Sequence, residues 1–149
     1  MTDEYFMGEA VKEAELALEK KEVPVGAVIV LDNKIIGRGH NRIESLQDPT
    51  AHAEIIAITS AANTLNSWRI LGATIYVTLE PCPMCAGAIM LARIAKCVFG
   101  VGDPLAGGLV SSYKIKTPKL EVVSGILEPV CKSLMKEFFK KLRNKNTKI

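Results

Sequence analysis

Residues 74–91 read TIYVTLEPCPMCAGAIML: a β-branched run is followed by two prolines and by two cysteines two residues apart. The run from Thr74 to Leu79 has the composition of a buried strand. Pro81 and Pro83 suit the start of a helix, because the fixed φ of proline and its missing N–H cost nothing there. We therefore expect a strand followed at once by a helix whose first turn carries Cys82 and Cys85. The positive end of that helix favours thiolate, which is the form that binds metal.

A second short segment supplies a histidine and a carboxylate. Thr50 is expected to cap a helix whose first turn holds His52 and Glu54. Imidazole and thiolate are typical zinc ligands, so we expect His52, Cys82 and Cys85 to bind one zinc ion. Three protein ligands leave a fourth tetrahedral position for water, whose pKa zinc lowers toward neutrality. Glu54 is then the expected base for that water.

The two segments together form a known chemical signature. Histidine-x-glutamate followed by proline-cysteine-x-x-cysteine is the pattern of zinc deaminases. In these enzymes water attacks the ring carbon that bears an exocyclic amine. The glutamate relays a proton to the ring nitrogen and then to the departing ammonia. The pattern predicts a hydrolytic deaminase.

Two other uses of the cysteine pair remain open. A structural zinc would need a fourth protein ligand from His40, Cys97 or Cys131. Both of these cysteines lie in apolar segments, where free cysteine is commonly buried. A redox pair would leave His52 and Glu54 without a role.

The bulk properties favour a single domain over residues 1–149. A chain of this length, with 48% hydrophobic residues, can bury a substantial core. Four cysteines are too few for a disulfide framework, which is typical of a reducing compartment. The longest apolar run, Val23 to Leu31, is too short to span a bilayer, and the first residues are acidic where a signal peptide is basic. We expect a cytoplasmic protein with no membrane segment.

Charge is concentrated at the C-terminal end. Residues 132–149 hold seven basic residues, Lys148 among them, and one acidic residue, whereas residues 1–131 hold 12 basic and 15 acidic residues. A basic end on a mildly acidic body indicates a polyanionic partner such as nucleic acid. The alternative is a solvated tail that only aids solubility.

Strands and helices alternate along the chain. We expect helices over 3–21, from 50 to beyond Leu65, from 82 and from 128, and strands over 23–31, 34–38, 74–79, 95–100 and 120–123, with Asp32-Asn33 as a hairpin turn. The second helix should bury Ile55, Ile58, Ala62 and Leu65, and the last helix should bury Val130, Leu134, Met135, Phe138, Phe139 and Leu142. Short connections between alternating elements predict an α/β three-layer sandwich, with a mixed five-stranded sheet and helices on both faces.

Two connecting segments are candidates for the rim of the site. Asn41 follows the hairpin, and its amide can both donate to and accept from one edge of a base. In a loop, asparagine more often bonds its own backbone. Residues 102–108, rich in glycine, form a loop expected to border the pocket.

Several segments resemble the bacterial tRNA-specific adenosine deaminases, which have a cytidine-deaminase-like fold. They are VPVGA (23–27), GHNR (39–42), DPTAHAE (48–54), WR (68–69), YVTLEPCPMCAGA (76–88) and FFKKLR (138–143). The resemblance implies hydrolysis of the wobble adenosine in a tRNA anticodon stem-loop to inosine, by a homodimer with one zinc ion per subunit and no organic cofactor.

The same resemblance implies roles for single residues. His52, Cys82 and Cys85 hold zinc, and Glu54 shuttles protons. Asn41 bonds the base, and Asp103 lies beside the sugar. The closing basic segment implies RNA contacts by Lys140, Lys141 and Arg143.

Residues 101–119 depart from that family's pattern. Gly102 and Leu105 stand where basic residues are common, and the segment is several residues shorter. Fewer phosphate contacts weaken nucleic-acid binding. Two alternatives therefore remain: a deaminase of a free base or nucleoside such as guanine, cytosine or cytidine, and a non-catalytic zinc-containing RNA-binding subunit.

Overall fold

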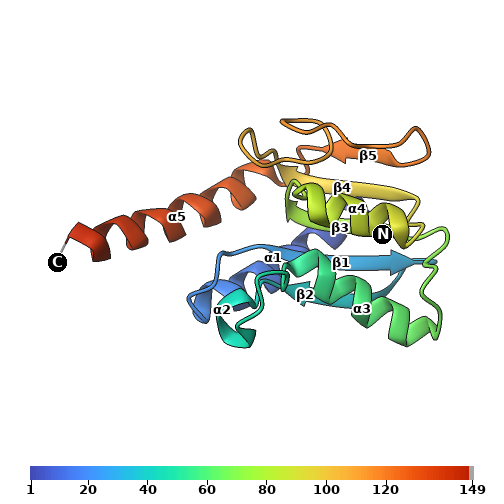
Figure 1. Cartoon of the computed structure of the whole chain (residues 1–149), viewed down its shortest axis with the longest axis horizontal. Helices are drawn as coiled ribbons and strands as arrows, with labels where there is room; N and C mark the ends of the chain where they lie inside the picture. The colour runs from blue at the N-terminus through green and yellow to red at the C-terminus, as the bar shows by residue number, and fades with distance from the viewer. Residues whose placement is uncertain (148–149) are drawn as a thin grey trace.

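The computed structural model describes residues 1–147, so Lys148 of the basic end lies outside the described residues. Its strands are β1 (Gly26–Leu31), β2 (Lys34–His40), β3 (Thr74–Leu79), β4 (Lys96–Val101) and β5 (Glu121–Ser124). Its helices are α1 (Asp3–Glu19), α2 (Ile43–Leu46), α3 (Ala53–Leu65), α4 (Pro83–Leu91) and α5 (Glu128–Thr147). Figure 1 shows the elements in place. The short helix α2 was not predicted, and the first strand begins at Gly26 rather than Val23.

The strands form one mixed sheet in the order β2-β1-β3-β4-β5. β1 pairs antiparallel with β2 and β3, whereas β3, β4 and β5 run parallel. The hairpin turn places Asp32 and Asn33 at φ 51° and 63°, the left-handed backbone required by the two-residue turn that suits a twisted hairpin. The predicted mixed five-stranded sheet is confirmed.

Side chains of alternate strand residues enter two separate cores. Ala27 and Ile29 face α3 and α4, whereas Val28 and Val30 face α1 and α5. A strand sends successive side chains to opposite faces, so a strand buried on both sides reads as one apolar run. The molecule is therefore the expected three-layer sandwich, with α3 and α4 on one face of the sheet and α1 and α5 on the other (Figure 1).

Helix α3 buries a different face from the predicted one. Its most deeply buried residues are Ala53, Glu54, Ala57 and Ala61. They lie against two glycines of β2: a Cβ added to Gly37 would be 2.6 Å from the carbonyl oxygen of Ala57, and one added to Gly39 would be 2.5 Å from that of Ala53. Because small residues meet small residues, the helix lies directly on the strand. Ile58, Ala62 and Leu65, which were predicted to be buried, are only partly buried at the edge of the core.

Helix α5 packs on the sheet through its first half only. Cys131 is buried, and Leu134 and Met135 are partly buried against the core. Val130, Phe139 and Leu142 remain 41 to 45% exposed, so the prediction that they belong to the core was wrong. For Phe139 and Leu142 the cause is visible in Figure 1, where the second half of the helix extends beyond the edge of the sheet, whereas Val130 is an exposed residue of the first turn. Of the helices in residues 1–147, none is long and apolar enough to cross a membrane.

Candidate metal centre and active site

The three expected zinc ligands come from the starts of two helices. His52 occupies the N-cap of α3 and Cys82 the N-cap of α4, where Pro83 is the first helical residue. Cys85 lies one turn further on and is buried. Cys82 thus precedes the first turn rather than lying on it.

Thr50 does not cap α3. Its backbone N–H and its hydroxyl both donate to Asp48 Oδ1, at 2.8 and 2.7 Å. The cap comes instead from Asn41, whose Oδ1 accepts a hydrogen bond of 2.9 Å from the N–H of Ala53. A residue distant in sequence satisfies an end-of-helix N–H that a local cap usually satisfies. The same bond fixes the end of β2 relative to the metal-ligand segment.

The ligand atoms lie at spacings that fit zinc. His52 Nδ1 is 3.6 Å from Cys82 Sγ and 3.5 Å from Cys85 Sγ. All three ligand atoms lie within 4.8 Å of one another. Zinc at its usual bond lengths to sulfur and nitrogen, with tetrahedral angles, sets such nitrogen and sulfur atoms about 3.6 Å apart. The donor set and its spacing therefore fit a zinc ion bound through Nδ1.

The alternative of a structural zinc site finds no fourth protein ligand in residues 1–147, where the group consists of His52, Cys82 and Cys85. His40 instead contacts Glu13 at 3.1 Å and Lys20 at 3.3 Å. Cys97 is buried in β4 and Cys131 in α5. The cluster therefore keeps one tetrahedral position that these side chains do not fill.

The two cysteines differ in how readily they ionise. A hydrogen bond from the Cys85 thiol, supported by one from His52, lowers the pKa of Cys82 to about 4. That bond and burial raise the pKa of Cys85 above its usual range. Because metal binds thiolate, binding at this cluster releases the remaining thiol proton.

Glu54 lies beside the cluster. It is 3% exposed, and its carboxyl group interacts with His52, Cys82 and Cys85. Burial raises the pKa of Glu54 to about 7. A carboxyl group with such a pKa can both accept and return a proton near neutral pH.

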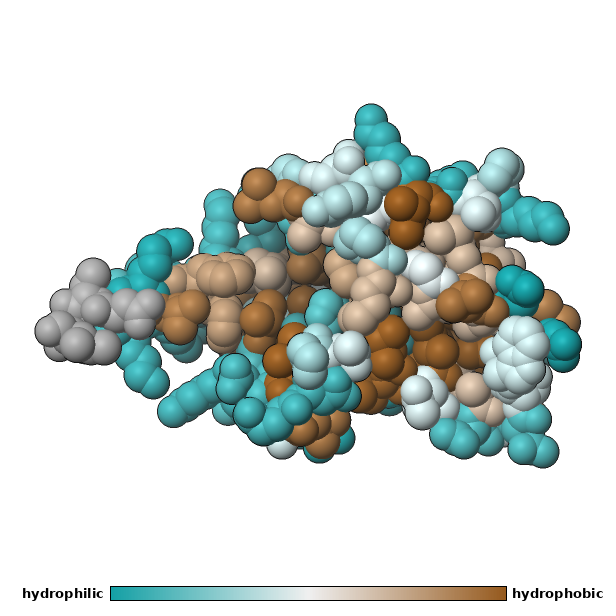
Figure 2. Space-filling view, in the orientation of Figure 1, coloured by the Kyte–Doolittle hydropathy of each residue, from teal (hydrophilic) through white to brown (hydrophobic). Residues whose placement is uncertain are grey.

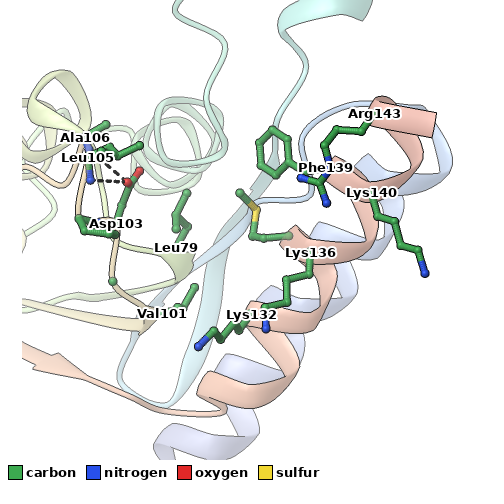
Figure 3. A pocket seen from close by; sticks show the side chains of 13 residues that line it. Leu79, Val101, Asp103, Leu105, Ala106, Lys132, Lys136, Phe139, Lys140 and Arg143 are labelled. Carbon is green, nitrogen blue, oxygen red and sulfur yellow. Dashed lines mark hydrogen bonds between the residues drawn. The ribbon is translucent and has the colours of Figure 1, made fainter. Parts of the chain in front are cut away.

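Asp103 lies in the loop after β4. Its Oδ1 accepts hydrogen bonds of 3.1 Å from the N–H groups of Leu105 and Ala106, which Figure 3 shows as dashed lines. The loop packs against the metal-ligand turn, since the N–H of Gly108 donates to the carbonyl of Pro81 at 2.7 Å. The prediction that residues 102–108 form a loop is confirmed. Residues 102–106 border a cavity, but the lining of this cavity does not include the three ligand residues or Glu54, so the prediction that the loop borders the active-site pocket stays a prediction.

One buried residue of this region was missed. Glu80, only 2% exposed, follows β3 and precedes the metal-ligand segment. Burial would raise its pKa, but hydrogen bonds from the Ser111 hydroxyl and from backbone N–H groups outweigh burial, so the pKa of Glu80 is lowered. The sequence offered only an acidic residue between a strand and a proline, which reads as exposed.

A cavity of about 900 Å³ lies between the Asp103 loop and α5. Its lining comprises Leu79, Val101, residues 102–106, Lys132, Met135, Lys136, Phe139, Lys140 and Arg143. Figure 3 shows Lys132 and Lys136 extending from α5 toward the loop side, with Arg143 next to Phe139. We call this space the α5 cavity. Its charged wall and aromatic ring suit a polyanion with stacking bases.

The expected RNA-contacting residues separate in the structure. Lys140 and Arg143 line the α5 cavity. Lys141 instead pairs with Glu137 at 3.1 Å and lines a second cavity, with the end of α1 and Lys145. Adjacent residues of a helix point in different directions, so Lys140 and Lys141 lie at different cavities although they are neighbours in the sequence.

Comparisons with known proteins extend over most of the chain. A family model of the MafB19-like deaminases matches residues 1–143. A tRNA-specific adenosine deaminase of Bacillus subtilis is 49% identical over 149 residues, covering 96% of this chain and 92% of the relative. One of Aquifex aeolicus is 48% identical over 148 residues, covering 97% and 98%. A solved structure from a study of A-to-I editing by tRNA:A34 deaminases at the wobble position of transfer RNA is 44% identical, with a TM-score of 0.84, covering 87% of this chain and 98% of that one.

Proposed function

This chain belongs to the tRNA-specific adenosine deaminases, and we propose that it acts as a single deaminase domain on the wobble adenosine of a tRNA anticodon. The reaction is hydrolysis: adenosine and water give inosine and ammonia. The observation that supports hydrolytic deamination is that the buried Glu54 lies beside a cluster of three ligands, which leaves one tetrahedral position of a bound zinc ion for water. The substrate follows from the near full-length similarity to relatives of that name.

Zinc is the cofactor in this proposal, one ion per subunit, held by His52 Nδ1 and the sulfurs of Cys82 and Cys85. The spacing of 3.5 to 3.6 Å between nitrogen and sulfur supports it. When bound, zinc supplies the Lewis acidity that makes water a nucleophile near neutral pH.

Glu54 moves the protons. It takes one proton from the attacking water as the water oxygen bonds to the ring carbon, and gives it to the ring nitrogen. It then takes the second proton and gives it to the leaving amine, so that the carbon–nitrogen bond breaks and ammonia departs. Its burial and its pKa of about 7 support both transfers.

Asn41 and Asp103 orient the nucleotide. The Asn41 oxygen is committed to the N–H of Ala53, so its NH₂ group is the one that donates to an acceptor on the base. Asp103 lies beside the sugar, on a loop that packs on the metal-ligand turn through Gly108 and Pro81.

An anticodon stem-loop with adenosine at the wobble position tests the proposal. We expect inosine from the stem-loop and no deamination of free guanine, cytosine or cytidine. A base inside a duplex must first be extruded, so the loop is the accessible form. Absence of inosine at stoichiometric enzyme, with ammonia released from a free base, would support the small-molecule alternative. Absence of both would leave the non-catalytic RNA-binding subunit.

The α5 cavity is the proposed path of the RNA backbone. We expect Lys136→Ala to weaken stem-loop binding and to reduce the slope of log affinity against log salt by about one. Lys141→Ala is the matched control, because Lys141 faces the other side of α5 and pairs with Glu137. Fluorescence anisotropy over a salt series measures both. Equal losses of stem-loop affinity in Lys136→Ala and Lys141→Ala would refute this path.

A homodimer is also part of the proposal. The helix α4, PMCAGAIML, has no charged residue, and a helix that is apolar on all sides is normally covered. Met84 and Leu91 are nevertheless 39% and 70% exposed, and Figure 2 shows hydrophobic residues at the surface where α3 and α4 lie. A second copy of the chain that covers this face would bury these exposed residues. We place the dimer in the cytoplasm, where its tRNA substrate is found. Light scattering at the mass of one chain would contradict the dimer.

A further inference from the structure

Within residues 1–147, the hydrogen bonds that the Glu80 carboxylate accepts all come from the loop that follows β4. Its Oε1 accepts from the N–H of Asp103 at 3.1 Å and from the Ser111 hydroxyl. Its Oε2 accepts from three consecutive N–H groups, those of Leu109, Val110 and Ser111, at 3.2, 2.9 and 3.1 Å. Five donors therefore converge on one buried carboxylate. Since no oxygen of a neutral side chain can accept all five, the arrangement requires an anion at this position.

The loop also touches the metal-ligand turn directly. A Cβ on Gly107 would collide with the Glu80 carboxylate, and a Cβ on Gly108 would lie 2.7 Å from Pro83 N and 2.8 Å from the carbonyl carbon of Cys82. The two glycines therefore allow the loop backbone to lie against the carboxylate and the turn at once. The side chain that anchors the loop is two residues away from the first cysteine ligand.

The loop has few other anchors of its own. Residues 102–120, which connect β4 to β5, contain no helix or strand. In the part of the chain that the structure describes, Asp103 Oδ1 accepts only from the N–H groups of Leu105 and Ala106, two and three residues further on. Ser112 Oγ donates to the carbonyl of Pro104 within the same loop. The position of the loop relative to the sheet therefore depends on Glu80, on the Gly108 to Pro81 bond and on Leu109, whose side chain is buried in the core.

We propose that Glu80 is a positioning residue: its buried carboxylate holds residues 103–111 in place, so that Asp103 and the rim of the α5 cavity meet the RNA at a fixed distance from Glu54. Glu80 does not touch the reacting atoms. It acts through the loop, and its effect is on substrate binding rather than on proton transfer. The effect of Glu80 on substrate binding rests on the proposed function, whereas its effect on the position of the loop does not.

The test is Glu80→Gln, which keeps the size of the side chain. A glutamine presents an NH₂ group to N–H donors on one side, so at least one of the two donor sets loses its acceptor. We expect the KM for the stem-loop to rise about tenfold or more, in line with the loss of charge-assisted hydrogen bonds, with kcat nearly unchanged and one zinc per chain. We also expect hydrogen exchange at the Leu109 to Ser111 amides to accelerate about tenfold or more.

Two further variants control the result. Glu121→Gln removes a carboxylate that pairs with Lys96 on the surface, and should change neither KM nor loop exchange. Ser111→Ala removes one of the five donors and should give a smaller change in the same direction, which keeps the inference testable if Glu80→Gln does not fold. Unchanged loop exchange and KM in folded Glu80→Gln, or a fall in kcat together with zinc loss, would overturn the role. If the wild-type chain makes no inosine, the proposed function fails, yet the exchange data still test whether Glu80 holds the loop.

Discussion

Replacing Glu54 with alanine is expected to lower kcat for inosine formation at least about a thousandfold while one zinc ion per chain is retained. General acid–base groups typically contribute factors of about 10² to 10⁴, and Glu54 serves every proton transfer of the proposed reaction. The zinc ligands keep their positions, since Glu54 is not one of the three grouped ligand residues. Single-turnover assays on the stem-loop, with zinc measured on the same sample, check both parts.

Two variants separate chemistry from structure in this test. Glu54→Gln keeps the volume of the side chain and should lose as much activity as the alanine variant. Glu15→Ala removes an exposed carboxylate from α1 and should be as active as wild type. Zinc loss in Glu54→Ala, or a kcat within tenfold of wild type, would contradict the assigned role.

The second large effect is expected from Cys82→Ser, which should lose zinc and lower the melting temperature by about 10 °C. Cys82 supplies one of three protein ligands and sits at the N-cap of α4, where its pKa is already low. Serine stays protonated at neutral pH and is a poor zinc ligand. Differential scanning fluorimetry and metal analysis measure the two losses.

Cys131→Ala is the matched control, because Cys131 is a buried thiol outside the cluster. It should keep one zinc per chain with a small loss of stability. A chelator added to wild-type protein should reproduce the Cys82→Ser melting temperature, and added zinc should restore the original one. A Cys82→Ser protein that still carries full zinc would refute the ligand assignment.

Much of the fold followed from local patterns. The β-branched run at residues 74–79 is β3, and the Asp32-Asn33 turn closes the hairpin as predicted. Pro83 begins α4. These features depend on nearest-neighbour chemistry, which a single sequence contains. The grouping of His52 with the two cysteines followed from a chemical signature rather than from spacing along the chain.

The errors have a common physical cause, which is contact between distant segments. The apolar stripe put Ile55 and Ile58 on the buried face of α3, yet the face with Ala53, Ala57 and Ala61 packs inward because Gly37 and Gly39 admit the helix backbone. Phe139 fits an apolar stripe, but α5 runs past the sheet that would have covered it. Glu80 is buried because a loop more than 20 residues away donates to it.

The two helix starts that carry the ligands lie far apart in the chain and meet through the sheet. His52 precedes Cys82 by 30 residues, and the strands β1 and β3 that lead toward the two starts pair with each other, for example at Ala27 and Val77. We therefore expect a metal held by all three donors to remain bound only while these central strands are paired, and local unfolding of this pair to release it. The two closely spaced thiols would then be open to oxidants.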